Sequence, residues 1–334
     1  MKISLRLVGC SVGFAALALT GALAQSPESP AAFSIQLLST FDYPGTGNQT
    51  RPQKISDMGD VVGIYVDTSL VSRGFIMLRN GTFSPPIVEP NDTGNLTEGR
   101  GINNSRLVCG DYLDATLGTF HGFFFLHNNY RNYDVPDSTT TIVLGLNNAG
   151  DFSGSVTPTG GIQQAFLSIG GTVTEFAVPN ATATLAYQLN ATNQSCGYYV
   201  DASGVTHGFF RDSDGTVRRP IDPVGSTGTI LFGNNDRNLI VGRYSDATGA
   251  THGILFLPPN QFVVYDFPGS TFTSLNGINK QGLVVGRYTD GSGIDHGILA
   301  RVVRGGAGVT LPLAPPSAPA QAVPQRAVDT APAY

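Results

Sequence analysis

Short apolar runs that end in glycine recur along the chain, about 45 residues apart. The clearest copy is Leu283-Val284-Val285-Gly286, which follows a polar turn and leads into a stretch of alternating residues. The glycine that ends the run occurs six times, at Gly63, Gly110, Gly154, Gly197, Gly242 and Gly286. Six copies of a unit this long predict a tandem-repeat architecture, in which each unit buries its apolar face against its neighbours.

Residues at fixed distances from this glycine, called the marker glycine below, predict how each copy folds. Asn or Ser stands seven positions before it, and Gly, Asn or Arg stands four positions before it. The Asn and Gly at these positions suit a turn with one residue at positive φ. In five copies Tyr and Asp follow at two and four positions after the marker glycine, so they face one side of a strand.

Further strands complete the unit. One opens at a triplet such as His252-Gly253-Ile254, and another ends at a proline such as Pro268, because proline cannot donate a hydrogen bond to a sheet. A weaker strand, such as residues 271–275, then leads into the next turn. We therefore predict an all-β fold, a six-bladed β-propeller built of four-stranded antiparallel blades.

The third copy and the two ends of the repeat region deviate from this pattern. In the third copy, Val156 and Pro158 replace the Tyr and the Asp, although the marker glycine keeps the period. The region begins with a proline-terminated strand over residues 33–44 and ends with only two strands, over residues 283–302. We expect the N-terminal strand to close the last blade, which would remove free sheet edges. Alternatively, Val309-Thr310-Leu311 supplies the closing strand.

The chain ends predict processing and secretion. Lys2 and Arg6 precede an apolar run that closes with Ala22-Leu23-Ala24, as is typical of a secretory signal peptide over residues 1–24. Cys10 resembles part of a lipoprotein signal but precedes the apolar run instead of following it. The run is also shorter than the roughly 20 residues of a membrane span. We expect a secreted protein, extracellular or in the periplasm or cell envelope, with a propeller over residues 25–304.

Composition narrows the class of protein. The 42 glycines, the absence of Trp and the charged fraction of 13% favour short strands and tight turns. A net charge of −5 gives no electrostatic footprint for nucleic acid. After cleavage only Cys109 and Cys196 remain, in the same slot of non-adjacent blades, and buried free thiols are favoured over a disulfide. The Pro- and Ala-rich residues 305–334 predict a disordered tail. We expect a monomer without a cofactor.

Three motifs together resemble a known family. They are Gly277-Ile278-Asn279, the pattern Val-Gly-x-Tyr-x-Asp that ends at Asp290, and triplets such as His121-Gly122-Phe123. The combination is similar to the HAF-repeat family of bacterial proteins, which are thought to be extracellular and are named for a His-Ala-Phe triplet. The resemblance covers residues 33–302, although the triplet here reads His-Gly-Phe or His-Gly-Ile. It implies no activity, no cofactor and no catalytic residue.

The repeated acidic and imidazole side chains are the candidate binding residues. They are Asp67, Asp114, Asp201, Asp246, Asp290, His121, His207, His252 and His296. A metal site would need several of them within about 2 Å of one ion, whereas equivalent atoms of different blades are held apart. Hydrogen bonds from Asp to His or to the backbone inside each blade are therefore the favoured interpretation, and we predict no metal site.

No motif for catalysis is present in the sequence. It contains no Gly-x-Ser-x-Gly elbow, phosphate loop or paired zinc motif. Because every strong feature is repeated, the first hypothesis is a non-enzymatic binding or structural scaffold whose partner is an extracellular polysaccharide or protein. The alternative is a polysaccharide hydrolase or lyase at the mouth of the channel. Its sign would be two non-repeated carboxylates there, from Glu28, Glu89, Glu98, Glu175, Asp92 or Asp137.

Overall fold

The computed structural model describes residues 33–45, 47–305, 308–314, 321–322 and 325–328. The predicted signal peptide therefore lies outside the described residues. All regular elements in the described part are β-strands, which confirms the all-β prediction. Within the same part of the chain, no helix has the length and apolar character needed to cross a membrane.

Four sheets have the size of one blade. The first contains β2 (Gln49–Ile55), β3 (Val61–Val66) and β4 (Ser72–Met77). The second contains β5 (Thr97–Ile102), β6 (Val108–Asp114), β7 (Thr119–Leu126) and β8 (Asn129–Tyr133). The third contains β9 (Ser138–Leu146), β10 (Phe152–Pro158), β11 (Gln164–Ile169), β12 (Thr172–Phe176) and β26 (Gln325–Val328). The fourth contains β13 (Ala183–Leu189), β14 (Ser195–Val200), β15 (Thr206–Arg211), β16 (Thr216–Ile221) and β25 (Gln321–Ala322).

The fifth sheet has nine strands. One half contains β17 (Gly228–Asn234), β18 (Ile240–Ser245), β19 (Thr251–Leu257), β20 (Gln261–Tyr265) and β24 (Val309–Pro312). The other half contains β21 (Phe272–Ile278), β22 (Leu283–Thr289), β23 (Asp295–Arg304) and β1 (Phe33–Phe41). The two halves are joined by one parallel pair, Thr251 with Phe272.

The predicted division into six separate four-stranded sheets is thus met only in part. Hydrogen bonding gives five sheets, because the bridge from Thr251 to Phe272 fuses two units into one. The first sheet has three regular strands, and beyond β4 only isolated bridges form, at Phe83 and Ile87. Pro85 and Pro86 lie between these bridges and have no N–H to donate, so a regular fourth strand cannot form there.

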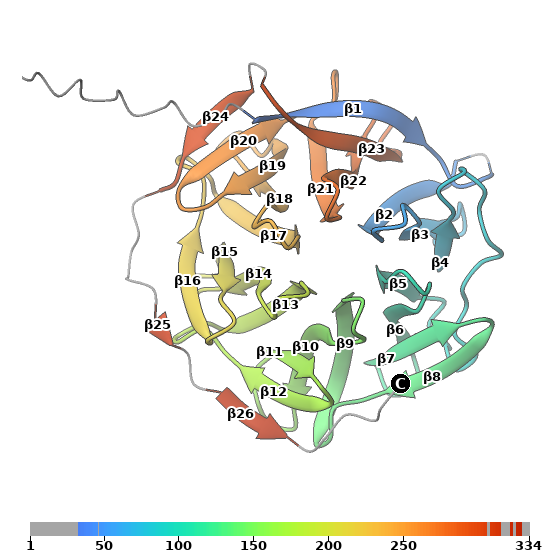
Figure 1. Cartoon of the computed structure of the whole chain (residues 1–334). Coiled ribbons are helices and arrows are strands. Elements are labelled where there is room, and N and C mark those ends of the chain that lie inside the picture. Colours follow the sequence, from blue (N-terminus) through green and yellow to red (C-terminus); the bar gives the residue numbers. More distant parts are fainter. Residues whose placement is uncertain (1–32, 46, 306–307, 315–320, 323–324, 329–334) are drawn as a thin grey trace, which may run out of the picture. The chain divides into compact units, whose positions relative to one another are not determined.

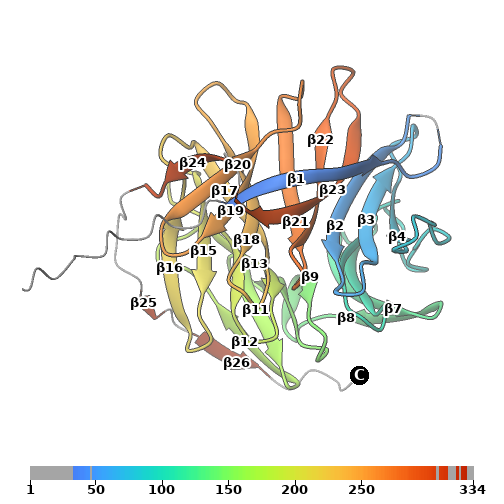
Figure 2. The ribbon, with the colours of Figure 1, turned by 45° about the horizontal axis from the view of Figure 1, so that its top comes forward.

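The sheets follow one another around a common axis, in the manner of a propeller (Figure 1). The inner strand of each unit, namely β2, β5, β9, β13, β17 or β21, faces the centre. Figure 2 shows the ribbon in a tilted view, with β1 alongside its antiparallel partner β23.

The described N-terminal strand belongs to the sheet of the last repeat. β1 runs antiparallel to β23, from Phe33 opposite Arg304 to Phe41 opposite Gly297. Val309-Thr310-Leu311, the alternative closing strand, lies in β24 and pairs with β20 instead.

The described parts of the C-terminal region differ from the expected disordered tail. β24, β25 and β26 pair with the outer strands β20, β16 and β12, respectively. The outer strand of a blade presents unpaired N–H and C=O groups, and an extended segment can satisfy them without an apolar core of its own. These described segments are therefore paired strands, and the rest of the predicted tail lies outside the described residues.

The turn before each marker glycine has the predicted backbone. The residue four positions before the glycine has a positive φ in every copy: Gly59, Arg106, Gly150, Asn193, Asn238 and Gly282. The Asn three positions earlier accepts turn N–H groups through Oδ1, as Asn279 does from Gln281 and Leu283.

The amide of the same Asn also links neighbouring sheets, which the sequence alone did not predict. Its Nδ2 donates to a backbone carbonyl of the next copy in a series of five hydrogen bonds: Asn103 to Asn147, Asn147 to Asn190, Asn190 to Asn235, Asn235 to Asn279, and Asn279 to Ser56. Buried apolar clusters also span neighbouring sheets, and one of them joins Ile55 and Phe75 of the first sheet to Val285 of the last.

Each marker glycine is required by close packing. A Cβ on Gly242 would meet the carbonyl oxygen of Ile230 on the paired inner strand, far inside van der Waals contact. The same is true of Gly110, Gly154, Gly197 and Gly286. Cys109 and Cys196, which directly precede two of these glycines, are buried free thiols. Burial raises the pKa of each thiol to about 12.

Candidate functional site

The repeated aspartates hold their own loops. Asp246 Oδ1 accepts hydrogen bonds from the backbone N–H groups of Thr248, at 2.8 Å, and Ala250, at 3.1 Å. The Thr248 hydroxyl also donates to this oxygen, and these bonds lower the pKa of Asp246 to about 2. Asp67, Asp114, Asp201 and Asp290 accept loop N–H groups in the same manner.

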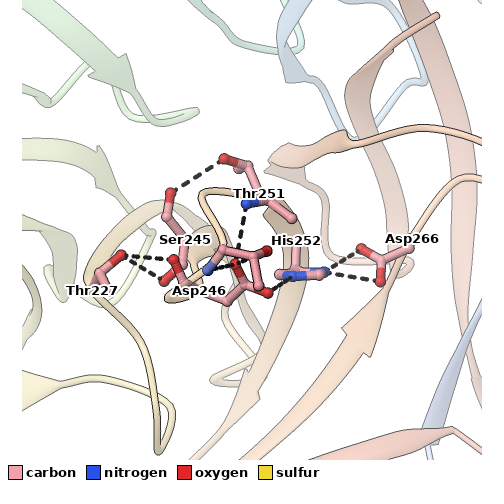
Figure 3. Close-up of polar contacts among 8 residues, drawn as sticks. Thr227, Ser245, Asp246, Thr251, His252 and Asp266 are labelled. Atoms are coloured by element: carbon pink, nitrogen blue, oxygen red, sulfur yellow. Dashed lines mark hydrogen bonds and ion pairs between the residues drawn. The ribbon is translucent and has the colours of Figure 1, made fainter. Parts of the chain in front are cut away.

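His252 lies between two carboxylates, those of Asp246 and Asp266 (Figure 3). His252 Nε2 is 3.3 Å from Asp246 Oδ2, its Nδ1 is 3.0 Å from Asp266, and its ring stacks on Tyr244. Burial lowers the pKa of His252, but the hydrogen bonds to the two carboxylates outweigh it and the pKa is raised. These contacts hold the end of β20, which Asp266 follows, against the loop after β18, which begins at Asp246.

The other three histidines have related environments. His207 bonds to Asp201 and Asp222, and His296 bonds to Asp290 and to Asp42 of the N-terminal segment. His121 bonds to Asp134 and, in place of the first aspartate, to the Thr119 hydroxyl. No group of three or more His, Cys, Asp or Glu side chains in the described residues could hold a metal ion. The hydrogen bonds of His207 and His252 are to aspartates of their own units.

A different set of side chains does converge, around a cavity on the axis, which we call the axial cavity. Its volume is about 170 Å³, and most of its lining residues come from the inner strands. The lining residues are Arg51, Gln53, Ile64, Glu98, Arg100, Tyr187, Phe232, Arg243, Ser274, Asn276 and Arg287.

Two repeat slots supply most of these side chains. One slot directly follows the marker glycine and holds Ile64, Arg243 and Arg287. The other is an irregularity in each inner strand, where one residue is skipped by the ladder. It holds Gln53, Arg100, Tyr187, Phe232 and Asn276. Residue type in these slots varies from copy to copy, so the repeat pattern of the sequence did not indicate them as binding positions. The sequence signal that could have indicated them is a position that differs among the copies and stands next to positions that do not.

On one side of the axial cavity, Arg100 bonds to two acidic side chains. Its Nε donates to Asp111 Oδ1 at 2.8 Å, and its Nη2 donates to Glu98. Burial opposes the charge of Arg100, but Asp111 and Glu98 raise its pKa. Asp111 is completely buried, and burial raises its pKa to about 6 although Arg100 acts in the opposite direction.

On the other side, two arginines share one carboxylate and a third lies nearby without an ion pair. Asp295 Oδ2 is 2.6 Å from Arg51 Nε and 3.2 Å from Arg287 Nη1. Arg243 has no hydrogen bond or ion pair to any of the described residues; its guanidinium lies over the rings of Phe232 and Phe272, at 5.5 and 5.3 Å. Burial lowers the pKa of Arg243. It also lowers that of Arg287 to about 10, where Arg51 and Arg243 add to the effect and Asp295 opposes it.

Lys54 links three inner strands next to this cavity. Its buried Nζ donates to the carbonyls of Phe232, at 2.6 Å, and Asn276, at 3.2 Å, and burial lowers its pKa to about 8. Lys54 is paired with the residue before the marker glycine, and four other copies have glycine at this position. The inner strands approach closely here, because a Cβ on Gly277 would be 2.8 Å from the Lys54 Cα. The axial cavity shares no lining residue with the Asn-lined cavity that contains Ile55.

Of the glutamates considered for an enzyme, the axial cavity contains Glu98. Asp111, which the sequence had not indicated, is its partner across the ladder of β5 and β6. Both carboxylates bond to Arg100, so neither is free in this arrangement. Glu89 caps the loop at Asn91 and does not line the cavity.

Comparisons with known proteins identify no family for this chain. No family profile matches it, and no curated protein matches it. Among solved structures, an arginine-to-alanine triple mutant of AofleA from Arthrobotrys oligospora aligns with a TM-score of 0.47 and 11% identity, over 93% of this chain and 96% of its own. A hypothetical protein from Leishmania major aligns with a TM-score of 0.33 and 10% identity, over 80% of this chain and 90% of its own.

Proposed function

We propose that this protein is a secreted, non-enzymatic binding scaffold, a closed propeller of six blades that holds a ligand in its axial cavity. The observation that carries the proposal is a contrast between two sets of positions. One set holds the same residue type in most copies of the repeat, and the other differs from copy to copy. The repeated Asp and His side chains are occupied by bonds within their own units. The variable slots, in contrast, gather polar and aromatic side chains around one cavity. Concave sites with a few convergent polar groups are the usual form of ligand pockets.

Several contacts support six units in a closed ring. His296 bonds to Asp42 as His252 bonds to Asp266, which supports a role for the N-terminal segment as the outer strand of the last unit. Across the junction between last and first units, Asn279 Nδ2 donates to the Ser56 carbonyl at 3.0 Å. Joining the two ends of the repeat region in one sheet leaves fewer free edges, which favours a monomer.

Secretion rests on the N-terminal pattern of Lys2, Arg6 and the apolar run to residue 24. The resemblance to the HAF-repeat family points to the same compartment. The partners that suit this location are an extracellular polysaccharide or protein. Without a catalytic motif in the sequence, binding is the simplest activity that the cavity supports.

A test should distinguish a filled axial cavity from an altered surface. The mature chain, beginning at Gln25, would be screened on a glycan array and by thermal shift, together with Gln53→Trp, which fills the axial cavity. Gln281→Trp adds the same bulk at an exposed position. We expect Gln53→Trp to abolish binding and Gln281→Trp to retain it. Equal binding by both variants, or no binding by the unmodified protein, would refute the proposal.

A second candidate is a polysaccharide hydrolase or lyase, and the pair Glu98 and Asp111 at the axial cavity favours it. The bonds of both side chains to Arg100 favour the scaffold, because an acid–base pair needs carboxylates that can reach substrate. Incubation with polysaccharides, followed by an assay for new reducing ends or unsaturated products, separates the two. Product that disappears in Asp111→Asn would establish the enzyme, and absence of product supports the scaffold.

A further inference from the structure

Cationic side chains outnumber anionic ones among the residues that line the axial cavity and the carboxylates bonded to them. Four guanidinium groups, from Arg51, Arg100, Arg243 and Arg287, stand against three carboxylates, from Glu98, Asp111 and Asp295. The Lys54 ammonium lies beyond them. Holding like charges together in a partly desolvated space costs free energy, and a bound anion would offset that cost.

Arg243 is the group that an anion would meet. It has no acidic or carbonyl partner in the described part of the chain, whereas the other three arginines bond to carboxylates. The rings of Phe232 and Phe272 contact its guanidinium and restrict its orientation. A guanidinium held in one plane presents paired N–H donors that match the two oxygens of a carboxylate.

Neutral groups around the same space suit hydroxyls and a ring. Tyr187 contributes a hydroxyl and an aromatic face, and Phe232 packs edge-on against it with centroids 4.9 Å apart. Gln53 donates one long hydrogen bond to the Arg51 carbonyl, at 3.3 Å, and retains its amide oxygen for other donors. Lys54 bridges inner strands on one side of this space, so a ligand would enter from the other side.

We propose that the axial cavity binds a hydroxylated carboxylate, a sugar acid, with its carboxylate on Arg243 and its hydroxyls facing Gln53 and Tyr187. This inference rests on the proposed function as a binding scaffold. A cavity that a ligand enters from one side admits a free sugar acid or the terminal unit of an acidic polysaccharide, and excludes the interior of a polysaccharide chain. The two sources offer the same chemistry.

The test is calorimetric titration of the mature protein at low salt with D-glucuronate, D-glucose, sodium phosphate and a glucuronate-terminated oligosaccharide. We expect D-glucuronate to bind and D-glucose to bind about tenfold or more weakly, since glucose lacks the charge-assisted bond. Arg243→Gln should weaken D-glucuronate by about 10- to 100-fold, whereas exposed Arg237→Gln should stay within about twofold. Arg243→Lys, which retains charge but loses the fork, should fall between them.

The outcomes separate this inference from the proposed function. Tighter binding of the oligosaccharide than of free D-glucuronate would identify the end of a polysaccharide as the ligand. Equal binding of the two would identify the free sugar acid as the ligand. If D-glucose binds as tightly as D-glucuronate and Arg243→Gln changes nothing, the sugar-acid inference is wrong while the scaffold stands. If only phosphate binds, the axial cavity recognises a tetrahedral anion and not a carboxylate, and the sugar-acid inference is wrong. If none of the four probes binds to the folded protein, the sugar-acid inference fails, and the glycan array decides separately whether the scaffold proposal holds.

Discussion

The amide link between the last and first units gives the sharpest test of ring closure. Asn279 Nδ2 donates to the buried Ser56 carbonyl at 3.0 Å, and its Oδ1 accepts the N–H groups of Gln281 and Leu283. Asn279→Ala removes all three bonds. The Ser56 carbonyl keeps a partner in the Gly59 N–H, and the partly buried Leu283 N–H loses its acceptor.

The magnitude follows from these bonds. The buried cross-junction bond contributes about 1 kcal/mol, and leaving the Leu283 N–H without an acceptor costs about the same. Gln281 N–H is in an exposed turn and can bond to water, so its loss costs little. We expect Asn279→Ala to lower the free energy of unfolding by about 2 kcal/mol.

The matched control is Asn235→Ala, which removes the same bonds between two units that are adjacent in sequence. Equilibrium unfolding in urea would be followed by far-UV circular dichroism, because the chain has no Trp for fluorescence. Equal losses for the two variants are expected if the ring is closed. A loss for Asn279→Ala that is about 1 kcal/mol smaller than for Asn235→Ala would refute the reasoning about the junction.

Three further predictions concern packing and protonation. Gly242→Ala should destabilise the protein by about 2 kcal/mol or more, because its Cβ would meet a backbone carbonyl, whereas Gly291→Ala, in open space, should be near neutral in the same urea assay. Burial lowers the pKa of Lys54 from 10.5 to about 8, so the unfolded chain binds the extra proton between these values and stability should rise with pH there, by about 3 kcal/mol at most. Lys54→Met should remove this rise, and a variant with an unchanged pH profile would contradict the assignment. Asp266→Asn should lower the pKa of His252 in an NMR titration, because one of the two carboxylates that raise it is lost; an unaltered pKa would contradict the role given to that contact.

The unit of the fold was predictable because its determinants are local and repeated. Positive φ at Gly282 and its counterparts follows from residue type within one turn. The regular spacing of the marker glycine, Tyr and Asp fixed which residues share a strand face. The pairing of β24 and β26 was not predictable in this way, because composition reports whether a segment can form its own core and not whether a neighbouring sheet edge will pair with it.

The candidate site depended on the tertiary structure. Arg51 and Asp295 are 244 residues apart in sequence, and only the meeting of the first and last units makes them an ion pair. Arg243 carries no local signal, since it occupies a strand position that in other copies holds Ile64 or Asp111. The sequence by itself therefore determined the repeating unit, through turns and strands whose conformation is set by near neighbours. The tertiary structure alone decided which variable side chains face one another across the axis, because that depends on strand irregularities and on how the units are arranged.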